Sequence, residues 1–264
     1  MNLPQFLLGL VFCTLGIQCA TADLVETFSG TGPYSTTNTG LSGFENPGWA
    51  QLGNAGAFST NSSGDQVFAI NTPPQTGEDG FRRNVGTTAF SSVLEVVNLD
   101  FDSGGSSYGA GVGLFASENV NGTGVYGSAG IGIYELNGEY SAKMGYAIGN
   151  DFYFPFQQNL GTSVPRIELF LDYAPDSING GGIFSTYYEL NHSGNRIHLG
   201  TIDGTMYTNS AEANREFFMN SYGAQGGYSE FNRFEITAVP EPPTLMGVAL
   251  GCLAAVLVRR KAKR

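Results

Sequence analysis

Two closely spaced aspartates are the first candidates for chemistry in this sequence. Asp100 and Asp102 alternate along an extended segment, so their side chains would lie on one face, about 6.7 Å apart. The segment 103–107, Ser-Gly-Gly-Ser-Ser, follows them, and one of its carbonyl oxygens would complete a Ca²⁺ site. Solvated strand acids are the commoner explanation of such a pair, and the Ca²⁺ site is the alternative.

Paired carboxylates also serve as acid and nucleophile in glycoside hydrolysis, and Glu135 and Glu139 come nearest to the required spacing. Between them stands Asn137-Gly138, the strongest short signal for a two-residue hairpin turn. We therefore expect a hairpin at 135–139 rather than a catalytic pair.

The histidines and cysteines offer little for catalysis. His192 and His198 are the only histidines, and on one extended strand they would lie about 20 Å apart. Segment 193–195 is expected to turn the chain between them, so we expect no shared zinc site. All three cysteines fall in the terminal segments described below, and no Gly-x-Ser-x-Gly nucleophile elbow is present.

Trp49 is the only tryptophan and the candidate for stacking against a sugar ring, since the apolar faces of sugars suit aromatic side chains. It follows Asn46-Pro47-Gly48, so it is expected near a loop. Packing of Trp49 into the core is the commoner role for such a residue.

These candidates must be positioned by β-strands, because apolar and polar residues alternate along much of the chain. In 93–102, Val97, Leu99 and Phe101 are expected on one face. Alternation of this kind is typical of an antiparallel sandwich with one buried and one solvated face per sheet. The expected strands are 66–70, 93–102, 109–115, 129–134, 141–148, 167–173, 183–190, 196–202 and 231–239.

Two similar glycine-rich stretches, 108–115 and 126–134, are expected to be adjacent antiparallel strands. Their small residues would permit the close approach of a loop, a sheet or a ligand. One short surface helix is expected over 213–218, because Asn209 and Glu212 have the spacing of a capping box. No linker composition divides 23–238, which predicts one domain.

The N-terminal segment 1–22 has the features of a secretory signal peptide. It carries no charge, has an apolar run over 6–17, and ends in Ala20-Thr21-Ala22, an A-x-A cleavage site. We expect Ala20 and Ala22 to direct cleavage before Asp23. A lipoprotein cut before Cys19 is the lesser alternative.

The C-terminal segment 239–264 combines a short motif, an apolar stretch and a basic tail. The motif is Pro240-Glu241-Pro242, and a helix over about 243–258 would be a marginal membrane span. By the positive-inside rule the tail 259–264 would stay cytoplasmic and leave 23–238 outside. The basic residues of this tail are Arg259, Arg260, Lys261, Lys263 and Arg264.

This arrangement resembles the PEP-CTERM sorting signal of exported bacterial proteins in its order, spacing and terminal position. Its sorting motif is Pro240, Glu241 and Pro242. The resemblance implies an inner-membrane intermediate, cleavage by a membrane-embedded exosortase, and then location at the cell surface or in an extracellular polysaccharide matrix. A plain C-terminal membrane anchor is the alternative.

The core 23–238 resembles, less specifically, the concanavalin A-like lectin/glucanase or laminin-G-like jelly roll. The residues that carry this are 24–28, Trp49 and 231–237. The resemblance implies that the first and last strands pair, and it favours calcium near a sugar-binding loop. Glucanases of that fold use a Glu-x-Asp-x-(x)-Glu motif, which this sequence lacks.

Composition supports these expectations. With 13% charged residues and 38 glycines, the chain is unlike a helical bundle or coiled coil. The net charge of the whole chain is −11, and the core without its basic tail is more acidic still, which disfavours nucleic-acid binding.

We therefore expect an all-β antiparallel sandwich (jelly roll), flanked by an N-terminal signal helix and a C-terminal transmembrane helix. Its expected function is that of a non-catalytic exported surface or matrix protein with a carbohydrate-binding core. The alternatives are a purely structural matrix protein without a small ligand and, last, a divergent glycoside hydrolase.

Overall fold

The computed structural model describes residues 24–28, 36–37, 40–41, 49–52, 57–64, 66–72, 79–84, 89–101, 110–119, 126–148, 151–175, 182–203, 215–222 and 227–238. These residues all belong to one compact unit, 22–238. The expected signal peptide 1–22 and sorting signal 239–264 lie outside the described residues. Within the described ranges, the structure contains no helix with the length and hydropathy needed to cross a membrane.

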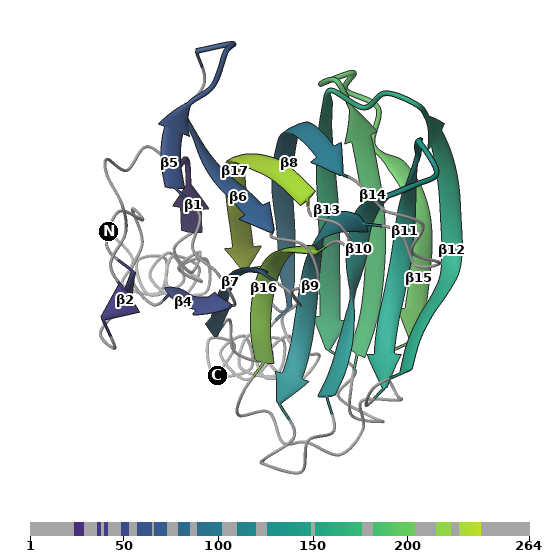
Figure 1. Ribbon diagram of the computed structural model, residues 1–264. Coiled ribbons are helices and arrows are strands. Elements are labelled where there is room, and N and C mark those ends of the chain that lie inside the picture. Colours follow the sequence, from purple (N-terminus) through teal and green to yellow (C-terminus); the bar gives the residue numbers. More distant parts are fainter. Residues whose placement is uncertain are drawn as a thin grey trace, which may run out of the picture. The chain divides into compact units, whose positions relative to one another are not determined.

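The described residues form two antiparallel sheets arranged as a sandwich, as the alternating sequence pattern predicts (Figure 1). The eight-stranded sheet follows the order β15 (Ile197–Asp203), β14 (Gly182–Leu190), β13 (Arg166–Pro175), β8 (Phe90–Phe101), β17 (Gly227–Ala238), β6 (Gln66–Thr72) and β5 (Ala57–Thr60), with β1 (Leu24–Glu26) also paired to β17.

The seven-stranded sheet follows the order β12 (Asp151–Gly161), β11 (Glu139–Ile148), β10 (Tyr126–Leu136), β9 (Ala110–Asn119), β16 (Arg215–Tyr222), β7 (Asp79–Asn84) and β4 (Trp49–Leu52). A separate two-stranded ribbon joins β2 (Thr36–Thr37) and β3 (Gly40–Leu41). Each expected strand corresponds to one of these elements.

The core fills the space between the sheets. Ile167, Leu169 and Leu171 alternate along β13 and are fully buried, as their period-2 spacing predicts. From the other sheet, Leu114 and Ile131 belong to the same hydrophobic cluster. Burial of each such side chain contributes about 1.5–3 kcal/mol, so these alternating residues hold the two sheets together.

The pairing of the terminal strands and the hairpin at 135–139 agree with the predictions made from the sequence. In the β1–β17 pair, Leu24 lies opposite Ile236. The first and last strands of the described core therefore pair, as the family resemblance implies. Asn137 and Gly138 connect β10 to β11 with φ values of 56° and 83°. Positive φ at both positions is the requirement of a type I′ turn, which confirms the hairpin at 135–139.

The two glycine-rich stretches form neighbouring strands, β9 and β10, as expected. Their glycines are covered by aromatic rings of the same two strands. A Cβ atom at Gly132 would lie 2.6 Å from the Tyr134 ring, and one at Gly113 would lie 2.1 Å from the Phe115 ring. The glycines therefore make room for aromatic side chains of the same sheet, Tyr134 and Phe115.

The expected helix over 213–218 is wrong, because residues 215–222 form strand β16. β16 lies between β9 and β7 and pairs with both. The capping-box spacing is a local preference of about 1 kcal/mol, and hydrogen-bonded ladders on both sides of the strand outweigh it.

The expected faces of 93–102 also change, at a bulge in β8. Tyr228 of β17 lies opposite Asp100, whereas Glu230 lies opposite Val97, so β8 has one residue more than β17 in this interval. Asn98 takes a φ of 50° there. As a result Val97 shares a face with Asp100, and not with Leu99 as predicted.

Candidate functional site

Of the site residues predicted from the sequence, the structure describes Trp49 and Asp100, which lie on strands of different sheets. Trp49 stands on β4, is 2% exposed, and packs edge-on against the Phe234 ring with centroids 5.4 Å apart. It serves the core and offers almost no surface to a sugar. Ala20, Ala22, Pro240, Glu241, Pro242 and the basic tail lie outside the described residues.

Asp100 is exposed on β8, and Asp102 lies outside the described residues. On its own face, Asp100 has Val97 and Tyr228 as neighbours along the β8–β17 pair. No group of three or more His, Cys, Asp or Glu residues in the described ranges is arranged to hold a metal ion. The described surroundings of Asp100 therefore do not supply a set of Ca²⁺ ligands.

The histidines do not share a site. His192 lies in the turn after β14 and contacts glutamates of β8 and β13, described below. His198 lies on β15, packs against the Tyr187 ring with centroids 4.9 Å apart, and has Nε2 3.1 Å from Thr201 Oγ1.

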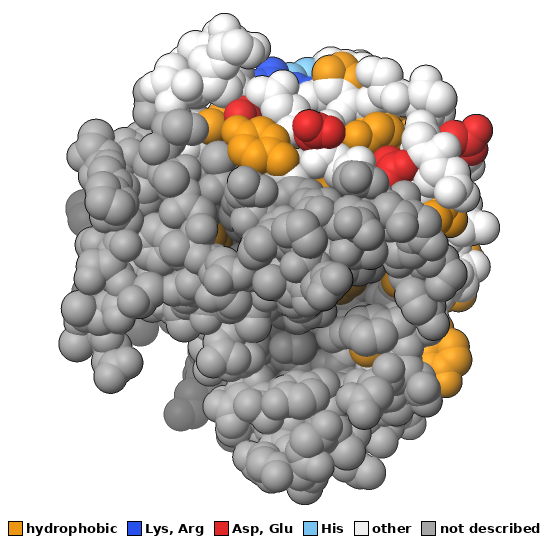
Figure 2. Space-filling view, in the orientation of Figure 1, with side chains coloured by type: hydrophobic (Ala, Val, Ile, Leu, Met, Phe, Trp, Pro, Cys, Tyr) orange, Lys and Arg blue, Asp and Glu red, His pale blue; other side chains and the backbone are white. Residues whose placement is uncertain are grey.

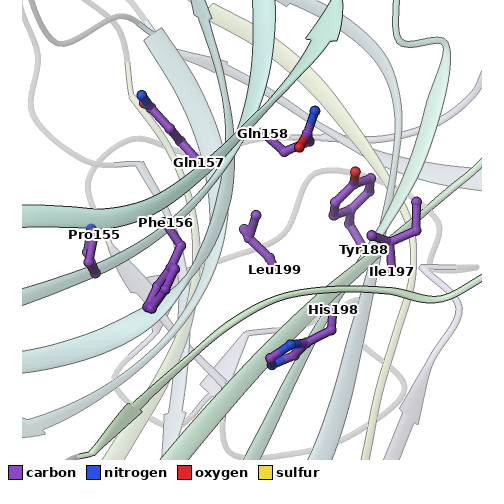
Figure 3. Close-up of a pocket in the computed structure, with 8 residues that line it drawn as sticks. All are labelled: Pro155, Phe156, Gln157, Gln158, Tyr188, Ile197, His198 and Leu199. Carbon is purple, nitrogen blue, oxygen red and sulfur yellow. The ribbon is translucent and has the colours of Figure 1, made fainter.

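A cleft of about 300 Å³ lies where the outermost strands of the two sheets meet, β12 and β15 (Figures 1 and 3). Its lining consists of residues 155–158 of β12, Tyr188 of β14 and residues 197–199 of β15. In Figure 3, Leu199 lies in the middle, with Phe156 on one side and Tyr188 with Ile197 on the other. We define these residues as the edge cleft.

The register of β11 and β12 explains why these side chains face the cleft. Phe156 lies opposite Met144 and Gln158 opposite Ala142. Met144 and Ala142 are fully buried between the sheets, and directly opposed residues of an antiparallel pair point to the same side. Phe156 and Gln158 therefore point inward too, but β12 is the last strand of its sheet, so Phe156 remains 38% exposed.

Gly200 of β15 fixes the position of the Phe156 ring. A Cβ atom at Gly200 would lie 2.4 Å from the Phe156 Cδ2 atom. The ring therefore rests directly on the backbone of β15, at a position where any side chain would displace it. This contact closes the base of the edge cleft and holds one aromatic ring in place at its surface.

The lining of the edge cleft is mostly apolar. It contains the rings of Phe156 and Tyr188, the His198 imidazole and the Gln158 amide, and no Asp, Glu, Lys or Arg. Gln157 lies opposite Lys143, so its side chain points to the other face of the sheet. Burial raises the pKa of the Tyr188 hydroxyl, so that group stays protonated and can donate a hydrogen bond. Such a surface suits an uncharged ligand that has both hydroxyl groups and apolar faces.

The titratable side chains that the fold does bring together lie elsewhere, on the outer face of the eight-stranded sheet. Glu95 of β8 lies directly opposite Glu168 of β13, and the two are 3% and 5% exposed. Glu95 Oε1 is 3.0 Å from Arg166 Nε and 2.8 Å from His192 Nε2. Glu95 Oε2 accepts a hydrogen bond of 2.9 Å from Asn232 Nδ2.

Glu168 has a matching set of partners. Its Oε1 is 2.8 Å from Arg233 Nη2, and its Oε2 is 3.5 Å from His192 Nδ1. Each glutamate therefore has its own arginine, and His192 lies over both. Two carboxylates that are this buried and each paired with an arginine form a structural ion-pair network.

The same turn is fixed by a second set of contacts. The Arg196 guanidinium lies 4.3 Å from the Phe170 ring centroid and 4.1 Å from that of Tyr187, and its Nη2 is 2.7 Å from Asp172 Oδ2. With His192, these contacts hold the turn 191–196 against the sheet and so position β15, one wall of the edge cleft.

Sequence reasoning missed the edge cleft and the glutamate pair. No motif marks either, because both depend on which strands become neighbours. The available signal for the glutamates is their isolation within apolar runs, Val-Leu-Glu-Val-Val around Glu95 and Ile-Glu-Leu around Glu168. A lone acid in such a strand requires a partner when the strand is buried.

Comparison with known proteins shows the fold and little more. No protein-family model matches the chain, and no curated protein is similar to it. Among solved structures, it is similar to an engineered GH43 glycoside hydrolase with endo-xylanase and exo-arabinofuranosidase activity, with a TM-score of 0.57 and 14% identity over 85% of this chain and 42% of that one.

It is also similar to GH43B of the Bacteroides ovatus xyloglucan PUL, with a TM-score of 0.52 and 13% identity over 72% of this chain and 36% of that one. The exoplasmic/lumenal domain of VIP36, in a Ca²⁺- and Man3GlcNAc-bound form, matches with a TM-score of 0.50 and 11% identity over 75% of this chain and 89% of that one. The chain thus spans less than half of either hydrolase and most of the VIP36 domain. These similarities support the lectin-like sandwich fold.

Proposed function

We propose that this protein is an exported, non-catalytic component of the cell surface or extracellular matrix that binds carbohydrate through the edge cleft. The observation that carries the proposal is the combination of an exposed, fixed aromatic ring, Phe156, with the Gln158 amide in a cleft that no Asp, Glu, Lys or Arg lines. The apolar face of a sugar packs on an aromatic ring, while its hydroxyls exchange hydrogen bonds with amides.

The fold supports a sugar-binding function by analogy alone. The VIP36 domain of similar fold was determined with a mannose-containing glycan bound, and the two GH43 proteins are carbohydrate-active. Glu95 and Glu168, the glutamates that the fold brings together, are each engaged by an arginine, which supports a structural over a catalytic role for this pair.

The binding proposal is tested with a glycan array probed by the mature protein, once with Ca²⁺ and once with chelator. We expect binding to a defined group of glycans and its loss in Phe156→Ala. Ile183→Ala is the matched control, because Ile183 is an exposed hydrophobic residue outside the edge cleft. Binding to no glycan would favour the structural matrix protein, and release of sugar from a bound glycan would overturn the non-catalytic proposal.

The location follows from the terminal segments and is a separate proposal. We propose export by the signal peptide 1–22, transient anchoring by about 243–258, and exosortase cleavage near Pro240-Glu241-Pro242. Intact mass of the protein isolated from its own cells is expected to lack 1–22 and the region after Pro242. A mature protein that still ends at Arg264 would contradict the sorting proposal and leave the plain anchor.

A further inference from the structure

We infer that the ligand of the edge cleft is an uncharged polysaccharide bound along its length on strand β12, rather than a single sugar or a chain end. The inference rests on the carbohydrate-binding function proposed above and specifies the class of ligand.

Three side chains of β12 form a row on the side that faces β15. Tyr153 lies opposite Tyr146, Phe156 opposite Met144 and Gln158 opposite Ala142. Because opposed residues share a face, Tyr153, Phe156 and Gln158 all point to the same side of the sheet. The row runs from the Gln158 amide through the Phe156 ring to the Tyr153 ring. It therefore extends the edge cleft beyond the residues that line it.

Both rings of this row are held in place before any ligand arrives. Tyr153 stacks on Tyr146 with centroids 4.9 Å apart and an interplanar angle of 18°, yet it is 44% exposed. Phe156 rests on the backbone at Gly200. Rings that are already ordered lose little conformational freedom on binding, so both can contribute to affinity.

The length of the row sets the size of the ligand. Tyr153 to Gln158 lie opposite Tyr146 to Ala142, four residue steps that span about 13 Å at about 3.3 Å per residue in a strand. This is more than the width of two pyranose rings. A single sugar would contact one of the two aromatic rings, whereas a chain lying along β12 would contact both and reach Gln158.

The charge of the surroundings selects against acidic polysaccharides. No Asp, Glu, Lys or Arg lines the edge cleft, where His198 is the one imidazole, and the chain carries a net charge of −11. On the described part of the face in Figure 2, acidic side chains are scattered among hydrophobic ones. A polyanion would therefore find no lysine or arginine in the cleft and would meet repulsion from the protein as a whole. The oxygen of the Gln158 amide, which lies on the same face as Phe156, suits a neutral hydroxyl as an acceptor.

Calorimetric titration of the mature protein tests this inference, with gluco-, xylo- and manno-oligosaccharides of one to six units and oligogalacturonides as the anionic series. We expect affinity for the neutral series that binds to rise roughly tenfold or more from disaccharide to hexasaccharide. Tyr153→Ala is expected to reduce affinity for the hexasaccharide roughly tenfold and to leave the monosaccharide unchanged, since it removes one stacking contact.

Phe156→Ala is expected to weaken binding at every length, and Tyr153→Phe, which keeps the ring and its stacking on Tyr146, is expected to bind like the natural protein. Equal affinity for short and long neutral sugars, or tighter binding of oligogalacturonides, would overturn the inference but not the carbohydrate-binding function. Absence of binding to every sugar at every length would instead overturn the proposed function.

Discussion

Replacement of Glu95 by Gln offers a direct test of the ion-pair network that positions the wall of the edge cleft. The substitution keeps the shape of the side chain and removes its negative charge. In the natural protein, the Glu95 carboxylate lies within 3.0 Å of nitrogens of Arg166 and His192 and accepts a hydrogen bond of 2.9 Å from Asn232.

The expected loss follows from the contacts that change. Glu95 Oε1 lies within ion-pair distance of Arg166 and His192 but has no hydrogen-bond partner of ordinary geometry among the described residues. Because Arg166 and His192 are partly exposed, loss of each pair costs about 1 kcal/mol. The NH2 group of the Gln amide would also face the N–H groups of Arg166 and His192, toward which the natural side chain directs a carboxylate oxygen. Burial of a neutral amide costs less free energy than burial of a carboxylate, so part of the expected loss in stability is offset. We expect a net decrease in the free energy of unfolding of about 2 kcal/mol.

The assay is equilibrium unfolding in denaturant, with thermal unfolding alongside. For a domain of this size, about 2 kcal/mol corresponds to a fall in Tm of about 4–8 °C. Glu139→Gln is the matched control, because Glu139 is exposed and contacts Asn159 at 2.8 Å on the surface. The control is expected to change stability by less than about 0.5 kcal/mol.

High salt distinguishes the effect of Glu95→Gln from that of Glu139→Gln, since ions screen exposed charge pairs far more than buried ones. The effect of Glu95→Gln is expected to persist in 1 M NaCl. A change in stability no larger than that of Glu139→Gln would refute the reasoning, because it would mean that desolvation of the Glu95 carboxylate cancels its pairing.

Three further substitutions test other features. Gly200→Ala is expected to reduce stability by about 1–3 kcal/mol in thermal unfolding, because its Cβ would overlap the Phe156 ring, and an equal loss in a Phe156→Ala background would exclude that cause. Ser229→Ala is expected to raise the free energy of unfolding by about 1 kcal/mol, since the buried Oγ has no hydrogen-bond partner among the described residues; a destabilised variant would show that this hydroxyl is bonded after all. Burial, with the hydrogen bond to Glu230 next, raises the pKa of Tyr228 from 10.0 to about 12, so the stability it confers is complete below pH 10 and is lost as the pH rises toward 12. Denaturant unfolding between pH 8 and 11.5 is expected to show a smaller decline in Tyr228→Phe, and an unchanged decline would contradict this assignment.

The sequence predicts the strands whose two faces differ. Ile167, Leu169 and Leu171 alternate with polar or half-buried residues, so the pattern of β13 is visible without a structure. β12 was not expected, because it lies at the edge of its sheet, contains Pro155, and exposes residues on both faces. An exposed edge strand has no apolar face to leave a periodic signal.

The candidate site was beyond prediction for a related reason. Phe156 and Gly200 are 44 positions apart in the chain, and their contact exists only because β12 and β15 end their respective sheets on the same side. Likewise, Glu95 and Glu168 become partners through the β8–β13 register, and a shift of one residue would move Glu168 to the opposite face. Spacing along the sequence carries no information about either pairing.

Pro155 has a consequence for how this protein behaves among its own copies. An eleven-residue edge strand such as β12 presents unpaired backbone groups on which strands of other chains can add, and so invites aggregation. Pro155 lies near its middle and has no N–H group, which interrupts the row of donors that an added strand would need. The edge is thereby closed to backbone pairing while its side chains remain accessible, so crowded molecules can stay separate with β12 still exposed.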